Sequence, residues 1–219
     1  MGRISCRIGS PLEERLNVVT HALGLAASIA ALPFLLQIGA RHGDGWVVFG
    51  TAVFGVTLVC AYAASTMYHA APPGPVKELW LRVDYVAVYL LIAGTYTPFM
   101  LGALRGPVGI TMLVIVWGGA LTGIFAKLRL GSRYPNLSTM AYLALGWIAL
   151  IAAGPMVKAL GWDGVRWIVA GGLAYSLGVI PLTWQHRLKF GHCAWHVFVL
   201  GGSACHFVAV AAYGIRIPQ

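Results

Sequence analysis

The sequence predicts an all-α fold: a polytopic membrane protein, built as a seven-transmembrane helix bundle with its N-terminus cytoplasmic. Of the 219 residues, 59% are hydrophobic and only 10% are charged, whereas soluble domains are about 45–50% apolar and about 25% charged. Apolar stretches, each near the roughly 20 residues that a transmembrane helix needs, follow one another along nearly the whole chain. Lys and Arg concentrate in alternate connections between these stretches, as in multi-pass proteins.

Charged residues, Gly and Pro separate the first three predicted spans. The first runs from about Leu16 to Ala40 and ends at the polar turn 41–45. The second covers about 46–69, and the sequence Ala-Pro-Pro-Gly-Pro at 71–75 closes it because these residues break helices. The third follows the short amphipathic segment Lys77–Arg82 and continues to about Leu104.

The remaining four spans are bounded in the same way. They are predicted at about Pro107–Ala126, Leu137–Met156, Val165–Trp184 and His192–Tyr213. The spans leave little chain for a soluble domain. We therefore expect a cytoplasmic N-terminal segment at 1–15, one membrane domain at 16–214 and an external C-terminal tail at 215–219.

The distribution of positive charge predicts the orientation. Ten of the fifteen Lys and Arg residues fall on the side of the N-terminus, and five fall on the other side. Cationic residues are enriched in cytoplasmic loops, so the N-terminus is expected in the cytoplasm and the C-terminus outside. The ten are Arg3, Arg7, Arg15, Lys77, Arg82, Lys127, Arg129, Arg133, Arg187 and Lys189.

Several other classes of protein are not supported. The net charge is +9, but the sequence has no basic run with interleaved aromatics, which would mark a nucleic-acid interface. No nucleic-acid partner is therefore expected. The four cysteines form no CxxC pair and indicate no disulfide framework. The first apolar stretch is far longer than the core of a cleavable signal peptide, so it is expected to remain as a span.

Polar residues at the span ends indicate a functional site. Ionisable groups at membrane depth are costly and are commonly functional. With the predicted orientation, polar residues of several spans fall on the cytoplasmic side. Counted by span they come from four, the first, second, third and seventh: Glu14, Asn17, His21, Ser65, His69, Asp84, His192 and His196. One shared polar site beneath the cytoplasmic surface is the simplest interpretation.

The spacing of the histidines indicates a metal site. His192 and His196 are four residues apart and so lie on one helix face, and His69 is expected at similar depth. Three imidazoles with one open position are the ligand set of a catalytic Zn²⁺. The alternative is that His192 and His196 are interfacial side chains that extend toward lipid headgroups.

Ser65 and Asp84 are the predicted catalytic residues. Ser65 lies one turn before His69, where its hydroxyl could meet a water at the metal. Asp84 could hold that water or orient a histidine. Cys193 is turned about 100° from His192 and is expected to pack, whereas His206 lies about 15 Å deeper and is expected to make an interhelical hydrogen bond.

The motifs Glu14-x2-Asn17-x3-His21, Ser65-x3-His69, Asp84 and His192-x3-His196 resemble those of the progestin and adipoQ receptor superfamily, and within it the bacterial hemolysin III family. The resemblance spans about Glu13 to Tyr213. It implies seven helices, a cytoplasmic N-terminus and a zinc ion held by His69, His192 and His196. It also implies location in the bacterial cytoplasmic membrane.

The resemblance leaves two classes of function open. Related adiponectin receptors and alkaline ceramidases imply a zinc-dependent hydrolase that cleaves a ceramide-like lipid amide and serves membrane-lipid homeostasis. The family name implies instead a non-catalytic cytolysin, or a sensor of lipid state, with structural zinc. The expected partners in either case are membrane lipids, and the oligomeric state stays open.

Overall fold

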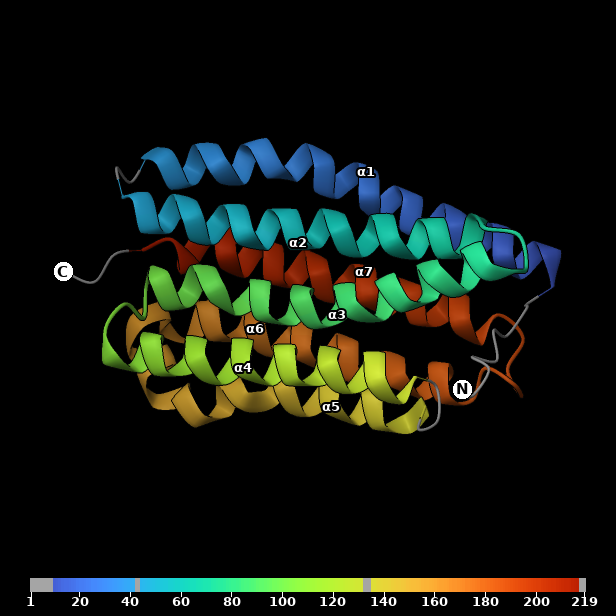
Figure 1. The fold of residues 1–219 in the computed structure, drawn as a ribbon. Coiled ribbons are helices and arrows are strands. Elements are labelled where there is room, and N and C mark those ends of the chain that lie inside the picture. The colour runs from blue at the N-terminus through green and yellow to red at the C-terminus, as the bar shows by residue number, and fades with distance from the viewer. Residues whose placement is uncertain (1–9, 42–43, 132–134, 217–219) are drawn as a thin grey trace.

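The computed structural model describes residues 10–41, 44–131 and 135–216, and every regular element within these ranges is helical. This confirms the all-α prediction, and Figure 1 shows the helices lying along one common direction. The elements are α1 (Pro11–Arg41), α2 (Gly45–Ala70), α3 (Pro75–Leu101), α4 (Pro107–Leu130), α5 (Pro135–Trp147), the 3₁₀ turn η1 (Ile148–Ala152), α6 (Ala153–Thr183), α7 (Gly191–Ala209) and the π-helical turn η2 (Val210–Gly214).

Six helical stretches of the described chain are long and apolar enough to cross a membrane, where the sequence predicted seven. The difference lies in Leu137–Thr183, which is one continuous stretch of 47 residues. At 1.5 Å per residue it would be about 70 Å long if straight, more than twice a hydrocarbon core of about 30 Å. It is interrupted at Gly161, whose φ of 70° is not helical. The seventh crossing stays a prediction.

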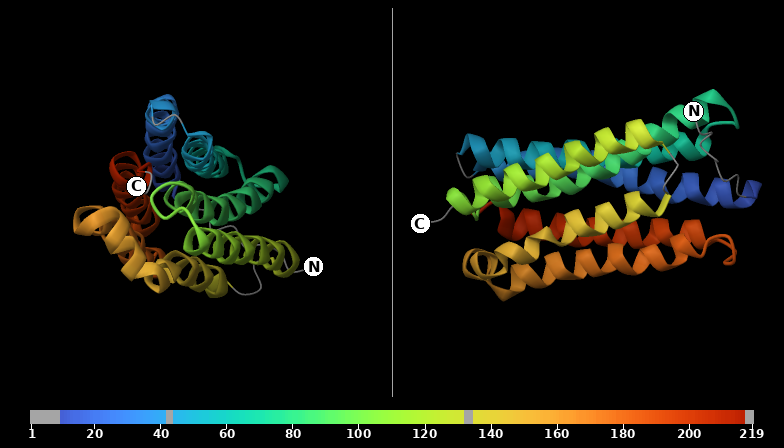
Figure 2. Two further views of the ribbon diagram at one scale, coloured as in Figure 1. Left: turned by 90° about the vertical axis from the view of Figure 1, so that its left-hand side faces the viewer. Right: turned by 60° about the horizontal axis from the view of Figure 1, so that its bottom comes forward.

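The helices form a closed ring. Each helix packs against the next one in the chain, and α1 also packs against α7, so that the first and last helices are neighbours (Figure 2). Large apolar side chains such as Val114 and Ile151 remain exposed on the outside, as is expected for a surface that meets lipid. At the α6–α7 contact, a Cβ atom on Gly171 would lie 2.4 Å from the His206 ring. Small residues therefore allow close packing there.

A bidentate ion pair holds the end of the bundle at which α2 begins, here called the Asp44 end. Asp44 Oδ1 accepts hydrogen bonds from the backbone N–H groups of Trp46 (2.8 Å) and Val47 (3.2 Å), which caps α2. The Arg105 guanidinium donates to both carboxylate oxygens of Asp44, at 2.6 and 2.7 Å. These bonds from Arg105 hold the pKa of Asp44 well below its usual range and raise that of Arg105.

The opposite end, at which α1 begins, is here called the Glu14 end. Ser10 and Glu13 form a capping box, in which the N–H of Glu13 donates to Ser10 Oγ (3.3 Å) and the N–H of Ser10 donates to Glu13 Oε2 (3.0 Å). Helix α1 therefore begins at Pro11, before the predicted start at Leu16. Glu13 Oε1 also accepts from the N–H of Phe190 at 3.0 Å, and this ties α1 to the start of α7.

Candidate metal centre

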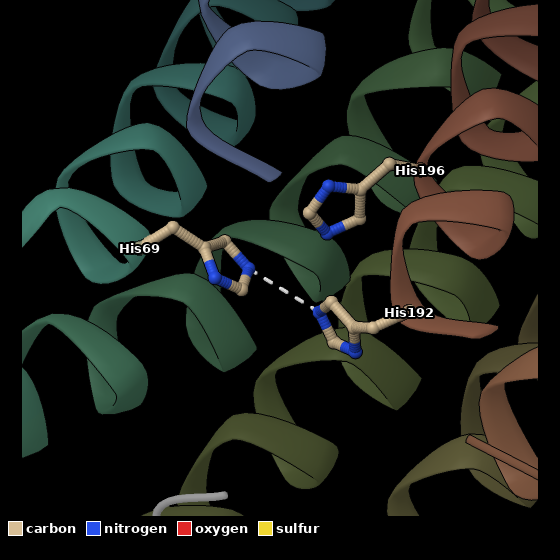
Figure 3. Close-up of side chains that lie close together, drawn as sticks. All are labelled: His69, His192 and His196. Carbon is tan, nitrogen blue, oxygen red and sulfur yellow. Dashed lines mark hydrogen bonds between the residues drawn. The ribbon is translucent and has the colours of Figure 1, made fainter. Parts of the chain in front are cut away.

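Three histidines converge at the Glu14 end. His69 comes from the last turn of α2, and His192 and His196 come from the first turns of α7. One ligand atom of each lies within 4.8 Å of the others. The Nε2 atoms of His69 and His192 are 3.2 Å apart, and Figure 3 shows the three rings turned toward one another. The structure thus brings the three predicted metal ligands together, and they could hold a metal ion.

Local structure explains this convergence. Helix α7 begins at Gly191, so His192 and His196 stand one turn apart on the same face. Helix α2 ends at Ala70, directly before the Pro-rich turn, and this places His69 at the same end of the bundle. Burial is deep, since His196 is 1% exposed and His69 is 6% exposed.

A hydrogen-bond partner at Nδ1 orients each ring. His69 Nδ1 lies 3.2 Å from a carboxylate oxygen of Glu14, and His192 Nδ1 lies 2.9 Å from the amide oxygen of Gln185. Both partner oxygens are acceptors, so both Nδ1 atoms donate, and in a neutral ring Nε2 then keeps its lone pair.

The third ring is oriented in the same way by Thr20. The Thr20 hydroxyl donates its one proton to the backbone carbonyls of Leu16 and Asn17. Because that proton is used, Thr20 accepts from His196 Nδ1, which is 3.2 Å away. In a neutral ring Nε2 of His196 then also keeps its lone pair, so each of the three rings is placed to bind a metal through Nε2.

This donor set fits a zinc ion. Tetrahedral zinc with Zn–N bonds of about 2.0–2.1 Å places its nitrogen ligands roughly 3.3 Å apart, close to the 3.2 Å between His69 and His192. In the structure this contact is a hydrogen bond between the two Nε2 atoms (Figure 3), and a metal ion bound there would replace its proton. Neutral imidazoles suit zinc and other transition metals, whereas Ca²⁺ and Mg²⁺ prefer oxygen ligands.

A buried lysine completes the support of His69. Lys77 is 2% exposed, and its Nζ donates to Glu14 at 3.1 Å and to the backbone carbonyls of Tyr68 (2.9 Å) and Ala71 (3.3 Å). Lys77 therefore closes the carboxyl end of α2 and fixes the carboxylate that orients His69. The sequence interpretation placed Lys77 on an amphipathic segment outside the spans, but it lies in the first turn of α3.

The histidines open onto a cavity of about 470 Å³ inside the helix ring, within the range of small-molecule sites. Residues of α1, α2, α3, α5, α6 and α7 line it, and it extends from the three histidines to His206. Ser65 and Asp84 also line it, and the Ser65 hydroxyl lies next to the Asp84 carboxyl group. The two predicted catalytic residues therefore act on each other beside the candidate metal centre.

The other residues considered in the sequence, His206, Cys193 and His42, are not part of the candidate metal centre. His206 Nδ1 donates to the carbonyl of Gly202 in its own helix (2.9 Å) and the ring stacks on Tyr175 of α6. The interhelical contact is thus stacking, not the expected hydrogen bond. Cys193 is half-buried and stands outside the group of three histidines, whereas His42 lies outside the described residues.

Three residues that orient the centre were missed in the sequence. Thr20 and Gln185 had no recognised spacing relative to the histidines they contact, because they lie 176 and 7 residues away along the chain. Lys77 was counted only as a loop cation. The usable signal was the presence of opposite charges on Glu14 and Lys77 at the same end of the bundle.

Comparison with known proteins identifies the same family as the sequence motifs. The family model described as "Haemolysin-III related" matches residues 10–207. The chain is 42% identical to "Hemolysin-3 homolog" of Bacillus subtilis (strain 168) over 206 residues, covering 94% of this chain and 96% of that protein. It is 41% identical to "Hemolysin-3" of Bacillus cereus over 201 residues, covering 92% and 91%.

A more distant relative supports the wider superfamily. "Monocyte to macrophage differentiation factor" of Homo sapiens is 25% identical over 211 residues, covering 94% of this chain and 86% of that protein. The family match spans nearly all of the helix bundle, including the three histidines. This membrane protein therefore belongs to the hemolysin III family, within the progestin and adipoQ receptor superfamily.

Proposed function

We propose that this protein is a zinc-dependent hydrolase that cleaves an amide bond of a membrane lipid, as a ceramidase does, and serves membrane-lipid homeostasis. One observation carries the proposal. Three imidazoles, two buried and one half-buried, have their Nδ1 atoms held by separate partners, and they stand beside a cavity that Ser65 and Asp84 also line. A purely structural site would leave no open position facing a cavity.

Each part of the site has a role in this proposal. His69, His192 and His196 would hold a zinc ion, which would supply a Lewis acid to activate water and polarise a carbonyl group. Asp84 takes a proton from the attacking water and gives it to the leaving nitrogen, as a general base and then a general acid. Ser65, whose hydroxyl lies next to the Asp84 carboxyl group, holds that group in place. The cavity receives the lipid chain and excludes bulk water.

Lateral access favours a lipid over a water-soluble substrate. A surface hollow lies between α5 and α6, and its lining residues include Thr139, Val179 and Thr183, which also line the main cavity. Trp184 and Arg187 also line this hollow. In our proposal a lipid enters sideways from the bilayer along this path.

We place the protein in the bacterial cytoplasmic membrane with its N-terminus in the cytoplasm. The excess of Lys and Arg in the connections of the Glu14 end supports this orientation. The break at Gly161 supports two crossings by Leu137–Thr183, and hence seven crossings in total. The metal centre then lies just beneath the cytoplasmic headgroups, at the depth of a lipid amide.

The decisive experiment replaces Asp84 with Asn. This change keeps the shape of the side chain and removes the group that exchanges protons, so hydrolysis of an N-acyl lipid should fall by about 10²–10⁴. Zinc content should stay near that of the wild type, and Ser65→Ala should have the same effect more mildly. Purified protein is assayed for fatty-acid release and for metal by mass spectrometry.

The matched control is Glu78→Gln, a carboxylate-to-amide change on the same helix and outside the cavity lining. It should leave both measurements unchanged. Full hydrolysis by Asp84→Asn with normal zinc content would contradict the proposal.

The second candidate function is a cytolysin, or a non-catalytic sensor of lipid state, with structural zinc. The printed names of the two Bacillus relatives favour it. It predicts that purified wild type releases dye from lipid vesicles without cleaving any lipid. The Asp84→Asn variant would then release as much dye as the wild type.

A further inference from the structure

Two buried polar side chains on α1 have hydrogen-bonding atoms that the protein does not use. Asn17 is 2% exposed and His21 is 6% exposed. Among the described residues, the buried side-chain atoms without a hydrogen-bond partner are Asn17 Oδ1, His21 Nδ1 and His21 Nε2. Buried polar groups are nearly always paired, and an unpaired one is costly and requires an explanation.

These atoms stand on the cavity wall beside the metal centre. Asn17 and His21 are one turn apart on α1 and both line the cavity. The His21 ring lies 3.6 Å from the His196 ring, centroid to centroid, with an angle of 38° between the planes, and it meets the Tyr62 ring edge-on at 5.3 Å. The two residues therefore adjoin the candidate metal ligands on the cavity side.

His21 is not a fourth member of the group that could hold the metal. The group contains His69, His192 and His196, and His21 offers the face of its ring to His196. Its two nitrogens, at the ring edge, remain available for another molecule.

We propose that Asn17 and His21 form a subsite that binds the polar head of the lipid and selects a head that can donate hydrogen bonds. Asn17 Oδ1 only accepts, so its partner must carry an O–H or N–H group. A neutral His21 has one donor and one acceptor nitrogen, so its partner must both donate and accept. A head with an amide and a free hydroxyl meets these requirements, whereas an ester without hydroxyls offers acceptors only.

The subsite deepens the proposed hydrolase function, because it names residues that determine which lipid reaches the metal. Sites built to hydrogen-bond a substrate group discriminate strongly against an analogue that lacks the group, since their own buried atoms are then left unpaired. Asn17 and His21 are thus specificity-determining residues and not members of the reacting group.

The test measures binding to the metal-free protein, where no turnover occurs. The two probes are a short-chain N-acyl amino alcohol with a free hydroxyl, and a matched ester in which N–H is replaced by O and the hydroxyl is methylated. Binding to protein in detergent is followed by native mass spectrometry. Wild type should bind the amide probe at least about tenfold tighter than the ester, as expected for a site with unpaired acceptors.

The variants separate hydrogen bonding from packing. Asn17→Leu and His21→Phe should bind the two probes equally, whereas His21→Gln, which keeps one donor and one acceptor, should retain the preference. Zinc uptake by each variant, measured separately, verifies that it is folded. Ser28→Ala is the control, because Ser28 is a buried residue of the same helix whose hydroxyl donates to the carbonyl of Leu25 and which does not line the cavity.

Equal binding of the two probes by wild type, or an undiminished preference in both Asn17→Leu and His21→Phe, would overturn the subsite. A failure of the hydrolase proposal gives a different result. The metal-free protein would then still prefer the amide probe, and the zinc-loaded protein would release no fatty acid.

Discussion

Two ion pairs hold opposite ends of the bundle, and they differ in what their carboxylates contact. At the Asp44 end, the carboxylate binds Arg105 and the backbone of α2, so the pair clamps two connections together. At the Glu14 end, one carboxylate oxygen contacts both Lys77 and Nδ1 of His69. The same chemistry thus acts as a structural clamp at one end, and at the other it fixes the orientation of a candidate metal ligand.

The largest expected difference between the ends is the side of the membrane on which each lies. In a cysteine-free background, Gly45→Cys at the Asp44 end should react with an impermeant thiol reagent in intact cells. Pro73→Cys at the Glu14 end should react only after permeabilisation, because the Lys and Arg distribution predicts a cytoplasmic location. Both positions are exposed. The reverse labelling pattern would place the metal centre at the outer leaflet.

Loss of the ligands should abolish metal binding. His69→Ala, His192→Ala and His196→Ala should each remove nearly all of the approximately one zinc per chain, because two imidazoles are a poor zinc site. Cys193→Ala should retain zinc, since Cys193 stands outside the group of three. The measurement is metal analysis of purified protein. Full zinc in the histidine variants together with zinc loss in Cys193→Ala would refute the ligand assignment.

A smaller effect should follow from loss of orientation. Glu14→Gln keeps an acceptor for His69 Nδ1 but removes the charge, and removal of such outer partners typically weakens metal affinity about 10–100-fold. The matched change at the other end, Asp44→Asn, should leave zinc affinity unchanged. Competition with a zinc chelator measures both. Equal affinities for Glu14→Gln and wild type would show that both ion pairs are only clamps.

The smallest effect is on stability at the Asp44 end. Asp44→Asn keeps the helix cap and loses the ion pair with Arg105, so the midpoint of thermal unfolding should fall at neutral pH. Because the folded pKa of Asp44 is lowered, the stabilisation is complete above the unfolded pKa of about 3.9 and is lost as pH falls toward the folded value. The difference between wild type and variant should therefore shrink below about pH 4. A constant difference would mean that the ion pair contributes little.

The sequence was sufficient to predict the helical fold and the histidines that converge, for a simple physical reason. Long apolar stretches and breakers such as 71–75 set the helices, and the i, i+4 spacing sets the face that carries His192 and His196. The depth of each histidine below the membrane surface follows from counting residues along its helix. The sequence also predicted a break between Met156 and Val165, and the non-helical Gly161 lies within it, but the backbone conformation at Gly161 was not predicted.

The partners that orient the rings could not be predicted from spacing. Gln185 reaches His192 only because the connection between α6 and α7 turns back at Phe190, a non-glycine residue with φ of 60°. Thr20 reaches His196 only because α1 packs against α7 with a particular rotation about its axis. Such contacts depend on how helices far apart in the sequence are rotated, which is a property of the whole packed ring.

The closure of the ring by α1 and α7 also bears on the order in which the protein is made. Glu13, Thr20 and His21 leave the ribosome early, yet Phe190 and His196 are 177 and 176 residues beyond Glu13 and Thr20. At a synthesis rate of about 5–20 residues per second, these early side chains wait on the order of 10 seconds or more for their partners. Until α7 has been made, His192 and His196 are not present beside His69. The candidate metal centre can therefore form only after α7 has been made.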